Sequence, residues 1–248
     1  MPEAVAAYSD NPLNPNAVRL VQNEILRSYQ LDFAKHAPPE LVSKITSIFE
    51  KIPRQLAKEN KKFSYVSISK HARARDYHDP MQWLLDARII NKVSNISQID
   101  LPLASHAHDD TFKIYPLDVG LLGVQLEVSP KTVLDQEGIF NNFKGALAEC
   151  FAAQELIAYG FPRIFYWTSQ GAAEVDFVVQ KDHKVFPLEV KSGENVRSKS
   201  LKVFGDMFPT CELSRSSTRN FNRSGKVSNY PLYGLNRFAT NTVILTTN

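Results

Sequence analysis

Three short apolar segments between residues 163 and 192 constrain the fold of this 248-residue chain most strongly. They read RIFYWTS, AEVDFVVQ and VFPLEVKS. Each is rich in β-branched and aromatic residues, which favour strands. A two-residue turn at Asp182 and His183 would join the last two as a hairpin in which opposed residue numbers sum to 365. The sequence therefore predicts a sheet with this hairpin in it.

This register separates the side chains of the hairpin into two faces. One face carries Asp176 opposite Glu189 and Glu174 opposite Lys191. A shift by one residue would set Asp176 against Leu188 and mix the faces, so the pattern favours the first register. The opposite face is uniformly apolar, through the pairs Val179–Phe186, Phe177–Leu188 and Val175–Val190.

The opposed carboxylates of Asp176 and Glu189 repel each other unless a cation lies between them. Magnesium takes oxygen ligands, typically one or two carboxylates together with waters and a phosphate oxygen. We therefore expect Asp176 and Glu189 to bind Mg²⁺ or Mn²⁺. Lys191 lies on the same face, where it can orient an attacking water and offset charge developing on phosphorus. This chemistry suits phosphodiester hydrolysis.

A glutamate on the preceding predicted helix, residues 142–159, is a third candidate. Glu149 lies between Gly145 and Ala146 on one side and Ala152 and Ala153 on the other, so its helix face is lined with small side chains. We expect Glu149 to face inward and to act as a catalytic and metal-binding residue. The alternative is a glutamate at the edge of the helix that reaches water.

The order of these residues resembles that of a known nuclease superfamily. Glu149 on a helix, Asp176 on a strand and Glu189-Val190-Lys191 on the next strand are similar to the PD-(D/E)XK pattern. The resemblance implies a core of one helix, three strands, a helix and a further strand. It also implies Glu149, Asp176, Glu189 and Lys191 as the nuclease set, with Glu174 as an auxiliary acid.

A second resemblance covers nearly the whole chain. It is to the prokaryotic AAA-type ATPases that end in a domain of unknown function, in which an ATPase module leads into a winged helix and a restriction-endonuclease-like domain. The resemblance implies that the ATPase module is missing here, because MPEAVAAY resembles the start of its helical lid. The segments that carry the resemblance include ILRSYQLDFAKHAPPELV, QWLLDARIINKV, FKIYPLDVGLL, YWTSQGAAEVDFVVQ, PLEVKSGENVRSKSLKVF and YPLYGL.

The two readings together give an α/β (α+β) fold in four parts. Proline-punctuated helices at 1–55 form the lid remnant. Residues 56–138 form a winged helix and connector, with a strand-like FSYVSIS, a helix around Trp83 and the alternating strand IINKVSNIS. Residues 139–238 form the nuclease-like domain, a mixed central sheet flanked by helices, and 239–248 a tail.

Basic residues indicate where DNA would bind. The whole chain carries a net charge of only +3, so any basic surface is local. Residues 181–226 hold ten Lys or Arg against five acids. Phosphate contact is one interpretation of these cations and a solvated surface is the other. The candidate nucleic-acid contacts are Lys70, Arg73 and Arg75 in the winged helix, and Arg197, Lys199, Lys202, Arg215 and Arg219 in the terminal domain.

Composition limits the location and partners. No segment approaches the roughly 18 apolar residues that a membrane span needs. The first fifteen residues contain Glu3 and Pro12 where a signal peptide would be basic and then apolar. We expect a cytoplasmic protein with no membrane partner. DNA is the expected partner, with self-association or a separate ATPase chain as further partners.

The sequence therefore predicts a metal-dependent DNA-binding and phosphodiester-cleaving domain of an AAA-type ATPase that lacks its nucleotide-binding module. The alternative is a non-catalytic DNA- or protein-interaction module of an ATPase switch.

We predict that this chain does not bind ATP by itself. A phosphate-binding loop needs a Gly-x-x-x-x-Gly-Lys-Ser/Thr segment, whereas the one Gly-Lys pair, Gly225-Lys226, is followed by Val227 and lacks the upstream glycine. Titration of the purified chain into a labelled ATP analogue should give no saturable signal. Binding in the micromolar range would contradict this prediction.

Overall fold

The computed structural model describes residues 1–129, 141–193 and 198–239. The chain divides into two compact units, and each is described by itself. Unit 1 comprises residues 1–92 and 113–151, and unit 2 comprises residues 93–112 and 152–248. Two strands and one helix contribute residues to both units: β1 (Ile90–Ile96), β2 (Ala107–Pro116) and α7 (Asn141–Ala158).

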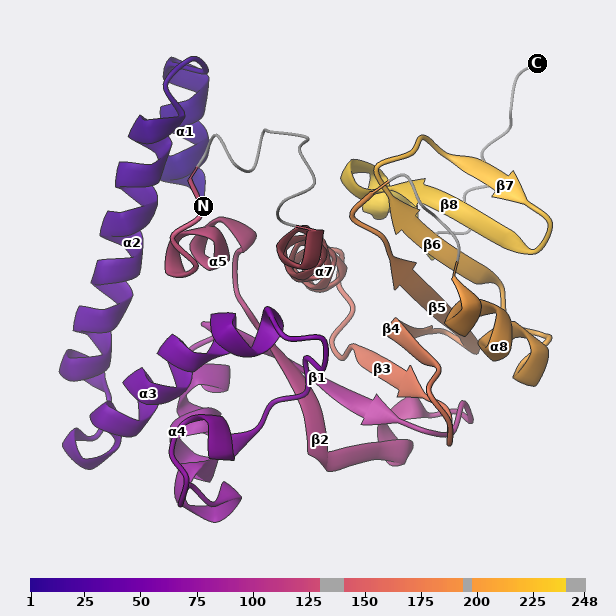
Figure 1. The fold of residues 1–248 in the computed structure, drawn as a ribbon, viewed down its shortest axis with the longest axis horizontal. Helices are drawn as coiled ribbons and strands as arrows, with labels where there is room; N and C mark the ends of the chain where they lie inside the picture. The colour runs from indigo at the N-terminus through magenta and orange to yellow at the C-terminus, as the bar shows by residue number, and fades with distance from the viewer. Residues whose placement is uncertain (130–140, 194–197, 240–248) are drawn as a thin grey trace. The chain divides into compact units, whose positions relative to one another are not determined.

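Unit 1 is mainly helical, as the proline-punctuated periodicity predicts (Figure 1). Proline takes the first position of α2 and α3, where its missing N–H costs nothing. The side chain of Asn14 caps α2 by accepting a hydrogen bond from the Ala17 N–H at 3.3 Å. In chain order, the helices that lie wholly in unit 1 are α1 (Pro2–Asp10), α2 (Pro15–His36), α3 (Pro39–Leu56), η1 (Tyr65–Ser67), α4 (Ala74–Asp86) and α5 (Val119–Gln125).

Phe33 forms the centre of the core of unit 1. It is fully buried, and its ring meets Phe49 of α3 at 5.3 Å and Trp83 of α4 at 5.7 Å, both edge to face. The buried face of α3 continues through Ile45 and Ile52, at the spacing of an amphipathic helix. The first two long helices therefore pack on later parts of the chain.

The segment FSYVSIS does not form the expected strand. Tyr65–Ser67 is instead a turn of 3₁₀ helix. The Ser67 hydroxyl donates to the Ser64 carbonyl at 2.7 Å, and the Ser64 N–H donates to Gln55 Oε1 at 2.7 Å. Such side-chain bonds to the backbone compete with a strand ladder, which explains why the prediction was wrong here.

Unit 2 is built on a mixed sheet. Eight described strands follow the order β2-β1-β3-β4-β5-β6-β8-β7 (Figure 1). The β1 strand pairs in parallel with β3 through Ser94–Phe165 and Ile96–Trp167. The strand that we assigned to the winged helix thus joins this sheet. The remaining elements are β3 (Phe165–Thr168), β4 (Glu174–Lys181), β5 (Lys184–Val190), α8 (Lys199–Met207), β6 (Leu213–Ser217), β7 (Asn222–Ser224), β8 (Val227–Pro231) and η4 (Leu232–Arg237).

The hairpin of β4 and β5 has the predicted register. Its pairs run from Lys181–Lys184 at the turn to Phe177–Leu188, and the paired numbers sum to 365. Asp182 occupies the turn with a φ of 53°, a left-handed conformation that aspartate tolerates better than most residues. The residues that follow on the two strands are Asp176 and Glu189.

One face of the unit 2 sheet packs against α8, which contacts β4. Ser198 caps this helix by accepting a hydrogen bond from the Leu201 N–H at 3.1 Å. Phe204 is fully buried, and its ring lies 5.1 Å from Trp167 and 4.9 Å from Phe208. The same core cluster includes Leu201, Leu213, Val175 and Val178.

The segment around 213–226 is not the exposed loop that its serines and arginines suggest. Residues Leu213–Ser217 form the strand β6, which pairs in parallel with both β5 and β8. The turn between β7 and β8 uses Gly225 with a φ of 58°. Serine has little strand preference, so pattern alone misses such a strand. The buried Ser217 hydroxyl donates a hydrogen bond to Asn229 Oδ1 at 2.8 Å.

These elements confirm a mixed α+β fold, with helices and one mixed sheet. The predicted boundary at 138–139, the candidate contact Arg197 and the tail after residue 239 lie outside the described residues. The lid and winged-helix labels remain predictions.

The packing of α8 predicts a strong effect of Phe204→Ala. Removing a fully buried phenyl ring that contacts Trp167 should lower the free energy of unfolding by about 3–5 kcal/mol. The control Val203→Ala lies on the same helix with 39% exposure and should change it by less than about 0.5 kcal/mol. Urea denaturation followed by tryptophan fluorescence measures both. Equal losses would contradict this packing.

Candidate functional site

Glu149 is buried on α7, at 5% exposure. The small residues of the same helix face, Ala146, Ala152 and Ala153, are fully buried as well. The structure therefore favours the inward-facing interpretation of Glu149 over the solvated one. A carboxylate taken out of water must find partners, because an uncompensated buried charge costs several kcal/mol.

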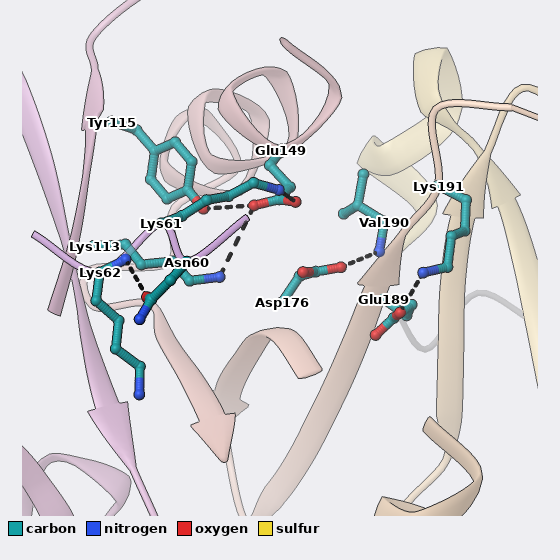
Figure 2. A network of polar contacts seen from close by, with 10 residues as sticks. All are labelled: Asn60, Lys61, Lys62, Lys113, Tyr115, Glu149, Asp176, Glu189, Val190 and Lys191. Atoms are coloured by element: carbon teal, nitrogen blue, oxygen red, sulfur yellow. Dashed lines mark hydrogen bonds and ion pairs between the residues drawn. The ribbon is translucent and has the colours of Figure 1, made fainter. Parts of the chain in front are cut away.

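Within unit 1, three side chains supply those partners (Figure 2). Tyr115 donates its hydroxyl proton to Oε2 at 2.9 Å, and the Lys113 ammonium lies 3.9 Å from the same oxygen. The Lys61 ammonium donates to Oε1. Lys113 is itself only 1% exposed. Glu149 thus belongs to a buried charge cluster of two cations, one anion and a phenol.

This surrounding sets the direction of the pKa shift of Glu149. Burial alone would raise the pKa of the carboxyl group. The charges of Lys113 and Lys61, together with the hydrogen bonds from Lys61 and Tyr115, outweigh burial and lower the pKa below its ordinary value of 4.5. Glu149 is therefore an anion at neutral pH.

In unit 2, Asp176, Glu189 and Lys191 lie at the end of the β4–β5 hairpin (Figure 2). Asp176 Oδ2 accepts a hydrogen bond from the Val190 N–H at 2.8 Å, which fixes this carboxylate against β5. Lys191 donates from Nζ to Glu189 Oε1 at 2.6 Å. The structure therefore brings together three of the four predicted catalytic residues within one unit.

The second oxygen of Glu189 is the unusual atom of this group. Glu189 is 5% exposed, and no described residue donates a hydrogen bond to its buried Oε2. A buried acceptor without a partner costs about 1–3 kcal/mol, and more when it is charged. A cation bound at Oε2 would remove this cost.

The donor set fits a hard cation. Asp176 and Glu189 offer carboxylate oxygens, the ligands that magnesium and manganese prefer. In the described ranges, no group of three or more His, Cys, Asp and Glu side chains is arranged to hold a metal ion. Two protein carboxylates are enough for magnesium when waters and substrate oxygens complete the shell.

The candidate DNA contacts fall in both units. Lys70, Arg73 and Arg75 are exposed in unit 1, where Arg75 lies 3.6 Å from Asp76. In unit 2, Lys199, Lys202 and Arg219 are exposed. Their exposure is compatible with either phosphate contact or a solvated surface.

Arg215 is partly buried on β6, where its Cα is paired with that of Glu189 on β5. Burial and then the charge of Arg219 lower the pKa of Arg215, whereas Glu189 raises it. Arg215 therefore responds to the charge of Glu189.

Sequence reasoning missed the lysines and the phenol around Glu149. Lys61 is one of several lysines in the segment KENKK, and Lys113 and Tyr115 lie inside the apolar run FKIYP. A lysine within a buried strand is rare unless it is paired, so the position of Lys113 could have indicated a buried anionic partner. It could not have named Glu149 as the partner, because 36 residues separate the two in the chain.

Comparison with known proteins gives two matches to domain families. The model of the family described as "Domain of unknown function (DUF8612)" matches residues 1–132. The model described as "Domain of unknown function (DUF4143)" matches residues 144–233. No curated protein and no solved structure matches the chain significantly. In the described residues, no helix is long and apolar enough to cross a membrane.

The fold is therefore that of an α+β chain in which two models of domains of unknown function match successive segments. The first family model covers more than half of the sequence, and the chain belongs to the DUF8612 family.

We predict that Tyr115→Phe destabilises the protein through Glu149. Loss of a hydrogen bond to a buried carboxylate should cost about 1.5–3 kcal/mol, measured by urea denaturation at neutral pH. The control Tyr8→Phe removes a hydroxyl from a 55% exposed tyrosine of the same unit and should change stability by less than about 0.5 kcal/mol.

The effect should depend on pH. Because the folded pKa of Glu149 is lowered, its stabilising interactions are complete above the ordinary value of 4.5 and are lost as the pH falls through the folded pKa. The difference between wild type and Tyr115→Phe should therefore shrink in acid. A difference that stays constant down to the lowest pH at which both proteins fold would contradict this cluster.

Proposed function

We propose that the chain is a metal-dependent DNA-binding and phosphodiester-cleaving domain of an AAA-type ATPase. The observation that carries the proposal is the buried Glu189, whose Oε2 receives no hydrogen bond from a described residue and whose Oε1 accepts one from Lys191. Asp176 lies on the neighbouring strand β4. Two carboxylates on neighbouring strands, together with a lysine, suit the hydrolysis of a phosphodiester.

In this proposal Asp176 and Glu189 hold Mg²⁺ or Mn²⁺. The metal, when bound, supplies Lewis-acid polarisation of a phosphoryl oxygen and a more acidic water. The Val190 N–H keeps the Asp176 carboxylate in place. Lys191 keeps the Glu189 carboxylate oriented through Oε1 and places a positive charge beside the position of a bound phosphate.

Glu149 is the third acid of the proposed set. Both of its oxygens already have partners in unit 1, Lys61 at Oε1 and Tyr115 at Oε2. As a metal ligand it would have to exchange one of these partners. Its cluster also gives it a role without metal, since the two lysines compensate its charge.

The ATPase part of the proposal is supported by the match of residues 144–233 to a DUF4143 domain, which typically occurs with AAA ATPase modules. DNA is the proposed substrate, and the cytoplasm the proposed location.

A non-catalytic module is the second candidate, and one observation favours it. Asp176 and Glu189 already have a backbone N–H and a lysine as partners, without any metal. Such a charge-balanced group can serve as a scaffold for holding DNA or a protein partner.

The substitutions Asp176→Asn and Lys191→Ala separate these two candidates. If the proposal is right, Mn²⁺ raises the melting temperature of the wild type, and Asp176→Asn abolishes both this shift and plasmid nicking. Lys191→Ala keeps the Mn²⁺ shift and loses nicking, because it removes a cation rather than a metal ligand. The control Asp182→Asn removes the same charge at the turn of the same hairpin and should behave as wild type.

The scaffold gives the opposite result. Asp176→Asn would then relieve carboxylate repulsion and raise the melting temperature without metal. A wild type that neither shifts with Mn²⁺ nor nicks DNA would refute the nuclease proposal.

A further inference from the structure

A cleft of about 230 Å³ lies within unit 2, lined by residues of α8, of β6 and of the start of β8. The cationic side chains of Lys202, Arg215 and Lys226 line it, together with the single acid Asp206. Three positive charges against one negative charge leave the lining at +2. Leu213 and Val227 form an apolar part of its wall. Such a lining recognises an anion.

The three cations come from separate elements. Lys202 is on α8, Arg215 on β6 and Lys226 at the turn before β8. The repulsion among like charges gathered around one small space favours an anionic ligand that neutralises them. Arginine and lysine are the side chains that bind phosphate, arginine through its planar fork.

Asn229 holds Arg215 in position. The Arg215 Nε–H donates to Asn229 Oδ1 at 3.0 Å, and Asn229 is only 2% exposed. The same oxygen accepts from the Ser217 hydroxyl at 2.8 Å. The Asn229 amide group donates to the carbonyls of Arg219 and Asn220 at 3.3 and 3.1 Å. Asn229 is therefore a positioning residue, because it fixes both the guanidinium plane and the turn after β6.

The cleft is also close to the carboxylates. Arg215 is paired with Glu189 on the neighbouring parallel strand, at a strand spacing of about 4.8 Å. Since Arg215 and Glu189 are on neighbouring strands, a phosphate at Arg215 and a phosphate near Glu189 would come from neighbouring nucleotides of one DNA strand.

The size of the cleft limits the ligand. Sites for complete small-molecule ligands usually measure about 300–1,000 Å³. At about 230 Å³ this cleft is smaller than that range, and suits one phosphodiester group with part of a sugar rather than a whole nucleotide.

We propose that this cleft binds one backbone phosphate of DNA that flanks the phosphate at the carboxylates, through Lys202, Arg215 and Lys226. The inference rests on the proposed function, since it assigns the flanking phosphate to the same substrate. It adds Lys226 as a contact and Asn229 as the residue that orients Arg215.

The test measures the affinity of the full chain for a fluorescent DNA duplex by anisotropy, over a range of KCl concentrations and without divalent metal. Each phosphate contact contributes about −0.9 to the slope of log K against log salt. Because one phosphate occupies the cleft, Lys202→Ala with Lys226→Ala should weaken binding, and the slope should become shallower by at most about 0.9. Adding Arg215→Gln removes the last contact to this phosphate and should bring the total change in slope to about 0.9.

The control is Arg163→Ala with Lys181→Ala, which removes two exposed cations of the same unit outside the cleft. It should leave the slope unchanged. Lys202 and Lys226 are exposed, so their variant should fold, and its melting temperature checks this. Asn229→Ala should weaken DNA binding when Arg215 is present but not in the Arg215→Gln variant. If Asn229 had a purely structural role, its replacement would weaken binding in both backgrounds.

A loss of about 1.8 in slope would assign the lysines to separate phosphates and overturn the proposal. So would an equal effect in the control, or a wild type with no affinity for DNA. Plasmid nicking with Mg²⁺ is measured in parallel. The expected slope change without nicking refutes the nuclease function and leaves the phosphate site. Nicking with an unchanged slope refutes the phosphate site alone.

Discussion

The pairing of β4 with β5 is the interaction on which the candidate site depends. These strands lie in the middle of the strand order of the unit 2 sheet. Because side chains alternate along a strand, the register that pairs Phe177 with Leu188 decides both faces at once. It buries an apolar face and brings the next residues, Asp176 and Glu189, to the same end of the hairpin. Burial of the apolar face thus offsets the cost of having two carboxylates near the same end of the hairpin.

Among the residues that the structure describes, Glu149 and Glu189 are both buried at 5% exposure, and their charges are compensated differently. Glu149 has Lys61 and Tyr115 on its two oxygens, with Lys113 as a further cation. Glu189 has Lys191 on one oxygen and no hydrogen bond from a described residue on the other. The first arrangement is electrostatically complete, which suits a structural role. The second leaves an acceptor for a ligand, which is why the functional proposal rests on Glu189.

The local sequence pattern was sufficient to predict some secondary-structure elements and insufficient to predict others. The hairpin register followed from alternation, and the helices of residues 1–55 were expected from their prolines. The strand Leu213–Ser217 was missed because its serines become strand residues only when their hydroxyls find partners such as Asn229. Likewise, Asp176 and Glu189 lie 13 residues apart and could be paired from sequence. The partners of Glu149 are distant in the chain, and only the fold reveals them.

Stability alone is a poor explanation for Glu189. Replacing a buried ion pair by apolar residues of similar size is often neutral or stabilising, so a scaffold gains little from keeping the Glu189–Lys191 pair. On the neighbouring strand, Arg215 is partly buried, and its guanidinium donates to the Asn229 side chain. The buried Glu189 Oε2, which receives no hydrogen bond from a described residue, is an acceptor that a bound cation would complete.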